Sequence, residues 1–460
     1  MNFAQPEYAL LLALIVLANA WLGGRFARKV ILLVASYYFY AYWDYRFAGL
    51  LALSTAIGFG LGLAIESAQR PSVRVGLLAI SVIWNLGLLA FFKYANFIVG
   101  PLVPHLGLTD WHVLTYGIVL PIGISFYTFQ LLSYSVDVYR RQVRATRSLL
   151  DFAIYIAFFP QLVAGPIVRA SEFLPQLAQM PKPTGATFYS GLMQLLRGLV
   201  KKMLIADTLA TFVDPVMAGP DLFAGPTVWL ALFAYAGQIY ADFAGYSDIA
   251  IGSARLLGFE LPENFRHPYL ADSPSDFWRR WHITLSTWLR DYLYIPLGGS
   301  RGSSFATALT LVVTMGLGGL WHGASWNFVL WGLWHGVLLI LTRSWRDRPV
   351  DGWRRVLRIL LTFSLVTAGW TLFRTAGASE FAALWGQMIW PNAGYAWFPP
   401  LPLVALALLL IEHLVWSSRH RELLSLPADR WQTPWLVGLA IAALVLFAPT
   451  GFRPFVYFQF

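Results

Sequence analysis

Long apolar stretches alternate with short polar loops along most of the 460-residue chain. Many of these stretches have the length expected of helices that cross a lipid bilayer, which needs about 20 apolar residues. They lie near residues 8–22, 31–45, 47–66, 75–99, 113–138, 356–373, 397–416 and 434–450. The pattern therefore predicts an all-α polytopic membrane protein.

The apolar pattern is less regular in the middle of the chain. Residues 149–165 are apolar but end at Pro160 and Gly165-Pro166, so we expect a broken or re-entrant segment that is buried in protein. Residues 187–213 carry basic positions within an apolar stretch, which predicts a partly interfacial helix. These basic residues are Arg197, Lys201 and Lys202.

A turn-rich loop at 215–226 precedes a long apolar helix near 227–257. This helix contains two carboxylates, Asp242 and Asp248, which are costly inside a membrane. Such groups more often pair with an arginine or cap a broken helix than take part in chemistry. We therefore expect pairing or capping for both.

The stretch 305–342 contains no Asp, Glu, Lys or Arg. As one straight helix it would extend about 57 Å at about 1.5 Å per residue, nearly twice the roughly 30 Å core of a bilayer. It must fold back, and residues 318–327 interrupt the apolar pattern. The halves 305–320 and 325–342 then carry His322 below the membrane surface. An ionisable group at that depth is a functional candidate, although a buried histidine can also serve only to bond a neighbouring carbonyl.

The chain is too polar to span a membrane between residues 260 and 304. Ser273, followed by proline and then by an acid at position 276, marks a helix start. Helical spacing after this start gives a tryptophan-rich apolar arc with His282 at its edge. The opposite side carries Arg279, Arg280, Ser286 and Arg290. The pattern fits an interfacial helix with tryptophan anchors as well as it fits a site around His282.

Composition and charge remove several function classes. The chain is 58% hydrophobic and only 12% charged, whereas soluble proteins carry about 25% charged residues. The net charge of +10 is concentrated in short loops, as the positive-inside rule predicts for cytoplasmic loops, so nucleic-acid binding is not expected. Cysteine is absent, which excludes disulfides and a cysteine nucleophile, and no histidine spacing predicts a metal site.

The distribution of basic residues also predicts an orientation. The first apolar stretch lacks a basic leader and precedes Arg25, Arg28 and Lys29, so we expect a retained span with its N-terminus outside. In this topology 305–320 runs outward and His322 opens toward the extracytoplasmic side.

Several stretches resemble the membrane-bound O-acyltransferase (MBOAT) superfamily. They are 242–302, which includes FWRRWHITLSTWLRDYLYIPLGG, then LGGLWHGASWNFVLWGLWHG at 317–336 and FVYFQF at 455–460. Within the superfamily they are similar to the bacterial branch of the alginate O-acetyltransferase membrane component. FFKYANF, LPIGISFYTFQ and FFPQLVAGPIVR fit the same branch. The resemblance begins near residue 30.

The resemblance implies a fold and a pair of catalytic residues. It implies one MBOAT-like membrane domain over 1–460, with a catalytic core at about 90–342 and a ring of about 11 tilted spans. Re-entrant and interfacial helices would surround a central tunnel. The histidine that the family uses for catalysis falls on His322, and its upstream partner falls on His282.

Other polar residues are expected to meet the acyl donor. Three arginines lie on the side of the predicted helix where a phosphorylated donor would bind. Asn327, or a backbone N–H at a helix end, is a candidate oxyanion donor. The expected donor-binding residues are Arg279, Arg280, Arg290, Asn327, Trp321 and Ser286.

The expected function is transfer of an acetyl group from a cytoplasmic thioester, such as acetyl-CoA, across the bacterial inner membrane, with no bound cofactor. The resemblance implies an extracytoplasmic polysaccharide acceptor, first an alginate-like exopolysaccharide, and a periplasmic partner of SGNH-hydrolase type. Peptidoglycan O-acetylation and teichoic-acid D-alanylation are alternatives within the family. A polysaccharide or lipid transporter, or an export scaffold, is the alternative of another class, although no paired repeats typical of transporters occur.

Overall fold

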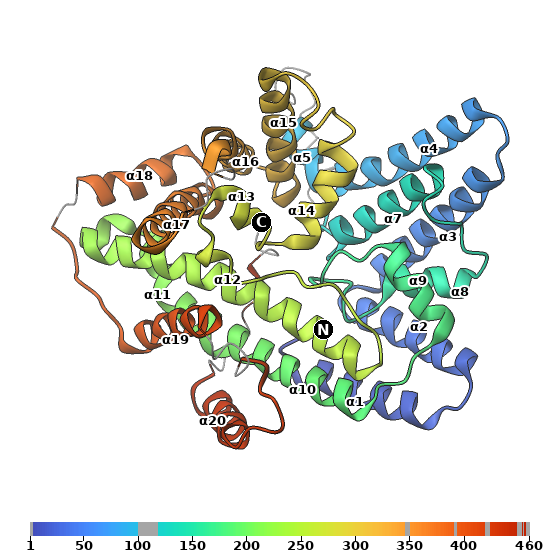
Figure 1. Cartoon of the computed structure of the whole chain (residues 1–460), viewed down its shortest axis with the longest axis horizontal. Coiled ribbons are helices and arrows are strands. Elements are labelled where there is room, and N and C mark those ends of the chain that lie inside the picture. The colour runs from blue at the N-terminus through green and yellow to red at the C-terminus, as the bar shows by residue number, and fades with distance from the viewer. Residues whose placement is uncertain are drawn as a thin grey trace. The chain divides into compact units, whose positions relative to one another are not determined.

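The computed structural model describes residues 3–99, 118–345, 350–390, 393–418, 424–448, 453, 455 and 456. Within these residues the regular structure is helical, and the β-type pairing is an isolated bridge between Phe223 and Tyr395 (Figure 1). The all-α prediction is confirmed.

The helices follow one another with short connections. In chain order they are α1 (Pro6–Trp21), α2 (Arg25–Ala41), α3 (Tyr45–Ser67), α4 (Pro71–Leu89), α5 (Ala95–Val99), α7 (Ile124–Tyr139), α8 (Leu149–Ala157), α9 (Ala170–Gln179), α10 (Gly185–Leu199), α11 (Asp207–Ala218), α12 (Gly225–Leu256), α13 (Pro274–Trp278), α14 (Ile283–Leu289), α15 (Ser304–His322), α16 (Trp326–Leu341), α17 (Gly352–Arg374), α18 (Ala378–Ile389), α19 (Pro400–Ser417) and α20 (Gln432–Phe447). Short π-helical segments are η1 (Ala90–Tyr94), η3 (Val200–Ala206) and η6 (Arg290–Tyr294), and 3-10 turns are η4 (Pro220–Leu222), η5 (Pro268–Leu270) and η7 (Arg343–Trp345).

Most predicted spans coincide with helices, and the exceptions have local causes. The span expected at 113–138 is helical only from Ile124, and residues 113–117 lie outside the described residues. The broken segment expected at 149–165 is confirmed, because α8 ends at Ala157 and the chain continues through buried turns. The loop expected at 215–226 is partly wrong, since α11 continues past Pro215 to Ala218. Helix α18 was not predicted.

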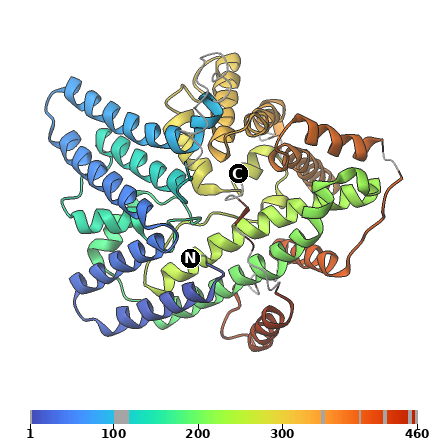
Figure 2. The same cartoon turned by 180° about the vertical axis from the view of Figure 1, so that it is seen from behind.

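The chain forms two compact units. The first comprises Met1–Leu192 with Ile249–Pro262, and the second Met193–Asp248 with Glu263–Phe460. Helices α10 and α12 contribute to both units, and Figure 2 shows the 32-residue α12 as one continuous helix. A single domain with its core at about 90–342 stays a prediction.

A buried arginine, Arg28, links α1 and α2 to the segment after α9 in the first unit. The Arg28 guanidinium donates hydrogen bonds to Asn19 Oδ1 at 2.6 Å and to the carbonyls of Met180 and Pro181, both at 2.7 Å. Asn19 in turn donates to the carbonyl of Leu257 at 3.2 Å. Because every acceptor of Arg28 is a neutral oxygen, the charge is solvated by fixed dipoles in place of a counter-ion.

The second unit contains a buried ion-pair network. The Lys202 ammonium, on η3, lies 2.6 Å from Asp207 and 2.8 Å from Asp242. The neighbouring Lys201 lies 3.0 Å from Asp248. The expected pairing of both α12 carboxylates is therefore confirmed, although only Asp248 also pairs with an arginine, Arg197 at 3.4 Å, and the partner of Asp242 is a lysine. The interfacial placement of the two lysines is wrong, because both are buried against acids of α12 that lie 40 and 47 positions further along the sequence.

The last described residues of the chain join this network. Phe455 is fully buried against aromatic rings of α12. The Val456 amide donates to Asp242 Oδ2 at 2.7 Å, and Arg453 pairs with Asp214 at 2.9 Å. Residues 453, 455 and 456 therefore form an anchored strap on the second unit.

Helices α15 and α16 form a close antiparallel pair (Figure 1). The fold-back predicted within residues 318–327 is confirmed, and the turn comprises residues 323–325. The Ser325 hydroxyl caps α16 by accepting a hydrogen bond from the backbone N–H of Asn327 at 3.3 Å. Gly319 does not form the turn. It lies inside α15, where any side chain would collide with the backbone of α16 at Phe328.

Replacement of Gly332 by alanine should destabilise the protein by about 1–3 kcal/mol or more, because the added Cβ would meet the carbonyl oxygen of Met315 on α15. Thermal unfolding in detergent measures the effect. Gly438→Ala is the matched control: it lies on a helix with open space around it, and alanine there should be neutral or stabilising by up to about 1 kcal/mol. Equal effects of the two changes would contradict the close packing of α15 and α16.

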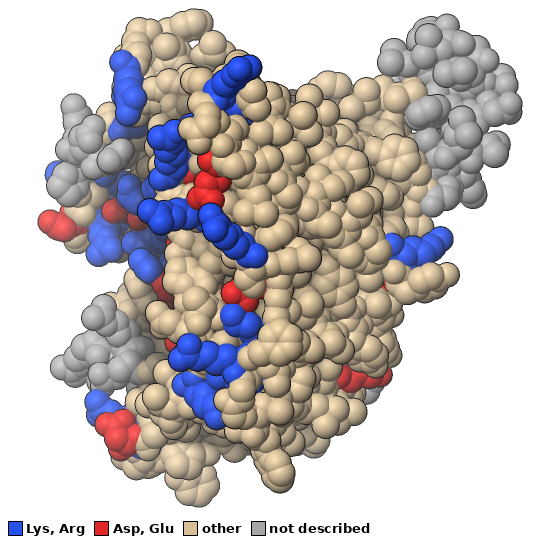
Figure 3. Space-filling view, turned by 90° about the vertical axis from the view of Figure 1, so that its right-hand side faces the viewer, with Lys and Arg blue, Asp and Glu red and all other residues tan. Residues whose placement is uncertain are grey.

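The described helices confirm a multi-pass membrane protein. Five stretches are long and apolar enough to cross a bilayer, and α1, α16 and α20 are shorter apolar helices. The five are α3, Pro71–Val99, α15, α17 and α19. Their outward positions carry exposed Leu, Ile, Val and aromatic side chains, and on the face in Figure 3 charged residues occupy only limited patches. The expected count of about 11 spans is not confirmed.

Candidate active site

The polar segment after α12 does not form one continuous helix. Ser273 is the N-cap that the sequence predicts, and its hydroxyl accepts a hydrogen bond from the Asp276 amide at 3.3 Å. Helix α13 nevertheless ends at Trp278, and α14 begins only at Ile283. At the break His282 has a left-handed backbone with φ of 42°, a conformation that costs a non-glycine residue free energy.

Backbone hydrogen bonds to the preceding loop, at residues 264–266, accompany this break. The Arg266 amide donates to the carbonyl of Arg280 at 2.9 Å, and the Ile283 amide donates to the carbonyl of Asn264 at 2.9 Å. These bonds replace helical ones and turn His282 inward. The prediction of one helix with His282 at the edge of its apolar arc is therefore wrong, because the helix is interrupted at His282 and the side chain is 0% exposed.

His282 is held in one tautomer by Asn264. The Asn264 Oδ1 atom lies 3.1 Å from His282 Nδ1 and also accepts from the amide and hydroxyl of Thr284, at 3.3 and 2.9 Å. The Asn264 amide nitrogen donates to Ser247 at 3.2 Å, which fixes the orientation of this side chain. Since Oδ1 only accepts, Nδ1 carries the proton and Nε2 keeps its lone pair. Burial lowers the pKa of His282 to about 3, so the ring is neutral at pH 7.

His322 is the last residue of α15 and is 4% exposed. Its ring is enclosed by aromatic side chains of three helices: the centroid lies 5.0 Å from Trp321, 5.0 Å from Trp331 and 5.4 Å from Phe373. The Trp321 ring also lies 6.0 Å from the His282 ring. The structure thus brings both predicted histidines to one aromatic cluster, with Trp321 in contact with each.

The predicted donor-binding residues separate into different environments. Ser286 and Arg290 line one cavity of about 270 Å³, together with Arg343. Arg280 lines a second cavity of about 1640 Å³. Arg279 is exposed and lies 3.4 Å from the Asp276 carboxylate. The four residues therefore do not share one site, because the break at His282 ends the common helical face.

Asn327 has a structural role in this conformation. Its Nδ2 atom donates to the carbonyl and the hydroxyl of Thr375, at 2.7 and 3.0 Å, and so ties the start of α16 to the end of α17. An amide engaged in this way is not aimed at a reacting carbonyl. The oxyanion role expected for Asn327 is therefore not supported.

Comparison with known proteins identifies the family. The family model of MBOAT, membrane-bound O-acyltransferase, matches residues 140–355. The chain is 44% identical to "Probable alginate O-acetylase AlgI" of Azotobacter vinelandii over 81% of this chain and 75% of that protein. It is 44% identical to the protein of the same name from Pseudomonas aeruginosa, over 81% of this chain and 72% of that one. A "Peptidoglycan O-acetyltransferase" of Helicobacter pylori is 35% identical over 75% and 71%.

The chain belongs to the membrane-bound O-acyltransferase family. The predictions of the family and of an O-acyltransferase are confirmed. The matched region includes both His282 and His322, whose individual roles remain predictions.

Asn264 is a residue of this O-acyltransferase that the sequence interpretation missed. It stands 18 positions before His282 and belongs to no helix, so helical spacing gave no indication of it. A loop asparagine directly after the Leu-Pro-Glu sequence, upstream of the histidine segment, was the available clue.

Replacing Asn264 by alanine should lower the kcat of the O-acyltransferase about tenfold to hundredfold, because His282 loses the acceptor that fixes its tautomer and Thr284 loses the same acceptor. Asn264→Asp keeps an acceptor oxygen and should restore most of this loss. Steady-state kinetics with KM and kcat resolved separately measure the effect. A change in KM alone, with no rescue by aspartate, would show that Asn264 does not orient the imidazole.

Proposed function

We propose that this O-acyltransferase moves an acetyl group from a thioester to a hydroxyl for O-acetylation of an extracytoplasmic polysaccharide, an alginate-like exopolysaccharide in the first place. The observation that carries the proposal is the pair of buried histidines on Trp321, one of them a fixed neutral tautomer. The 44% identity to proteins named alginate O-acetylase supports the acetyl group and the polymer class.

In the proposed reaction the hydroxyl oxygen of the acceptor attacks the thioester carbonyl carbon. The new C–O bond forms as the C–S bond breaks, and the thiol leaves. His322 takes the hydroxyl proton and returns it to the departing sulfur, which conserves protons over the cycle. The aromatic enclosure of His322 excludes water and so protects the thioester from hydrolysis.

The surroundings of His282 favour a positioning role. Its Nδ1–H is committed to Asn264, and its Nε2 is buried with no hydrogen-bond partner among the described residues. Nε2 can therefore accept a hydrogen bond from the acceptor hydroxyl or from the leaving thiol. Protonation of the His282 ring is disfavoured, since burial lowers the pKa of His282 to about 3.

The donor in this proposal is acetyl-CoA or an acyl carrier in the cytoplasm. The cavity of about 270 Å³ that Ser286 and Arg290 line is also lined by Arg343, so a hydroxyl and two guanidinium groups, of which Arg290 pairs with Asp291 at 2.6 Å, surround a space in which a phosphate could bind. The basic loops support a cytoplasmic placement of this side under the positive-inside rule. The proposed location is the bacterial inner membrane, and the acetyl group would leave on the opposite side.

The acceptor step has two forms in this proposal: direct transfer to the polymer or loading of a periplasmic partner of SGNH-hydrolase type. Peptidoglycan acetylation is the second candidate, supported by 35% identity to the Helicobacter pylori protein. D-Alanylation has weaker support, since "Teichoic acid D-alanyltransferase" of Bacillus subtilis is 27% identical over 55% of this chain.

The experiment that tests the proposal follows both products of the reaction. Purified protein in liposomes is given acetyl-labelled CoA on one side and acetyl-acceptor polysaccharide on the other, alone or with a periplasmic extract. An acetyltransferase releases free CoA and transfers label to the polymer. A transporter moves polymer without CoA release, and an export scaffold does neither, so either result would overturn the proposal.

A further inference from the structure

Three side chains with metal-binding chemistry meet away from the His282–His322 cluster. His267 belongs to the loop before η5, and Glu412 and His413 lie near the end of α19. One ligand atom from each residue lies within 4.8 Å of the ligand atoms of the other two. His267 has a left-handed backbone with φ of 46°. This conformation is strained for a non-glycine residue, and such residues cluster at functional sites.

Each of the three residues has a buried ligand atom without a hydrogen-bond partner among the residues that the structure describes. These atoms are His267 Nδ1, Glu412 Oε2 and His413 Nε2. His413 is only 4% exposed. A buried polar atom that stays unpaired costs about 1–3 kcal/mol, and three at one place indicate a missing common partner.

The remaining atoms of two of these side chains are held by neighbours. His413 Nδ1 lies 3.0 Å from the carbonyl of Leu409, and the Lys201 ammonium lies 3.0 Å from Glu412 Oε1. The His267 ring stacks on Trp416 with centroids 4.7 Å apart. Metal-binding histidines and carboxylates are typically oriented in this way by a second hydrogen bond from each side chain.

We propose that His267, Glu412 and His413 form a site for a divalent transition-metal cation, with Zn²⁺ as the best match. Two imidazoles and one carboxylate are a common protein ligand set for Zn²⁺, and they leave the fourth tetrahedral position to another ligand. Either imidazole can bind the cation only in its neutral form.

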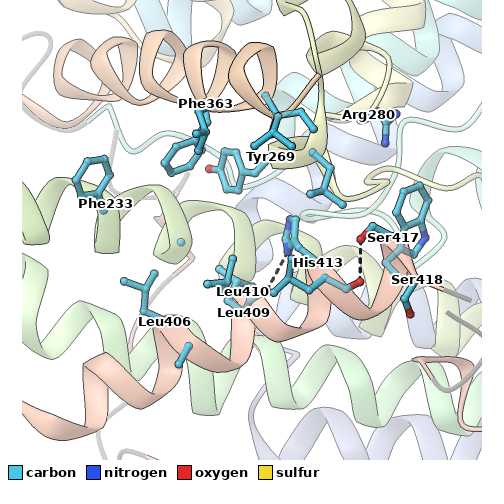
Figure 4. A pocket seen from close by; sticks show the side chains of 18 of the residues that line it. Phe233, Tyr269, Arg280, Phe363, Leu406, Leu409, Leu410, His413, Ser417 and Ser418 are labelled. Carbon is cyan, nitrogen blue, oxygen red and sulfur yellow. Dashed lines mark hydrogen bonds between the residues drawn. The ribbon is translucent and has the colours of Figure 1, made fainter. Parts of the chain in front are cut away.

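A cavity beside His413 can supply the fourth ligand of the cation. His413 lines the cavity of about 1640 Å³, where Figure 4 shows it between Tyr269 and Leu409. Lys201 lies 3.0 Å from both Glu412 and Asp248, and Arg197 lies 3.4 Å from Asp248, so the proposed carboxylate ligand already has a cation beside it. Water, hydroxide or an anionic group in the cavity completes the site.

The metal joins two segments far apart in the sequence. His267 and the two α19 residues share no helix, so the metal would fasten α19 to the loop that follows α12. This role goes beyond the proposed acyl transfer and does not depend on it, because none of the three residues contacts His282 or His322 through a described bond or ring contact.

Metal analysis of the purified full-length protein tests the site. We expect about one zinc ion per chain after removal of loosely bound metal, with loss of this zinc in His267→Asn and His413→Asn. Glu263→Gln is the matched control, because it removes an exposed carboxylate from the same loop and should keep the zinc. In addition, cobalt exchanged into the wild-type protein should give the intense visible absorption of tetrahedral Co²⁺, and His413→Asn should abolish it.

Two outcomes would overturn the proposal. One is wild-type protein that carries no zinc, shows no cobalt spectrum and gains no thermal stability from added zinc, which would mean that a water molecule fills the space. The other is zinc retained equally by all variants, which would place it elsewhere. Should the histidine variants fail to fold, Glu412→Gln provides the same comparison, since it is nearly isosteric and should weaken zinc binding at least tenfold.

Discussion

Replacing His322 by alanine should reduce acetyl transfer about 10²–10⁴-fold while the protein remains folded and abundant. The reason is that the change removes the proposed base from a water-excluding aromatic enclosure, where no solvent molecule can replace it. The release of CoA from acetyl-CoA and the acetyl content of the polymer measure the effect together. Fluorescence-detected size-exclusion chromatography establishes that the variant is folded.

His335→Gln is the matched control for this experiment. His335 is also fully buried, lies on α16 and contacts Trp331, as His322 does. Its replacement should affect stability more than kcat, because His335 does not contact Trp321 or His282 in any described ring pair. Normal acetylation by His322→Ala, or an equal loss of kcat in both variants at equal folded yield, would remove His322 from the reaction.

Replacing Lys202 by methionine should lower the free energy of unfolding by about 3–5 kcal/mol. The side chain is 2% exposed and is shared by two carboxylates, Asp207 at 2.6 Å and Asp242 at 2.8 Å. Methionine fills a similar volume but leaves both acids buried without their cation. Chemical unfolding in detergent, followed by tryptophan fluorescence, measures the change.

Two further variants test whether the loss of stability comes from the uncompensated buried charge or from a non-specific effect of the substitution. Lys202→Met combined with Asp242→Asn should recover part of the lost stability, because one of the uncompensated charges is removed. Arg266→Ala breaks an exposed ion pair with Glu263 and should change the free energy of unfolding by no more than about 1 kcal/mol. A Lys202 variant as stable as the Arg266 variant would show that the network contributes little.

The helical architecture was predictable because a bilayer imposes its own length and polarity on the sequence. Apolar stretches of about 20 residues report spans directly, and the uncharged stretch 305–342 had to fold back for reasons of length alone. The same argument placed His322 next to the turn, where α15 ends. These features depend on local composition, so the sequence contains them.

The features that the sequence did not reveal depend on tertiary partners outside the element that carries each residue. His282 turns inward because residues 264–266 replace its helical hydrogen bonds. Lys202 is buried because α12 supplies a carboxylate to it. His267 and His413 meet only after α19 has packed. No spacing rule contains these tertiary contacts, and a pattern of basic residues looks the same whether the lysines face lipid headgroups or buried acids.

The strap made by residues 453, 455 and 456 has a consequence for biogenesis. Its backbone bond to Asp242 and the packing of Phe455 join it to residues of α12, which is translated much earlier. At about 5–20 residues per second, the ribosome delivers the strap roughly 10–40 seconds after α12. Until then the carboxylate of Asp242 has one hydrogen bond fewer, so nascent chains must wait in the membrane in an immature state, and chains cut short before residue 453 should be substrates for membrane proteases.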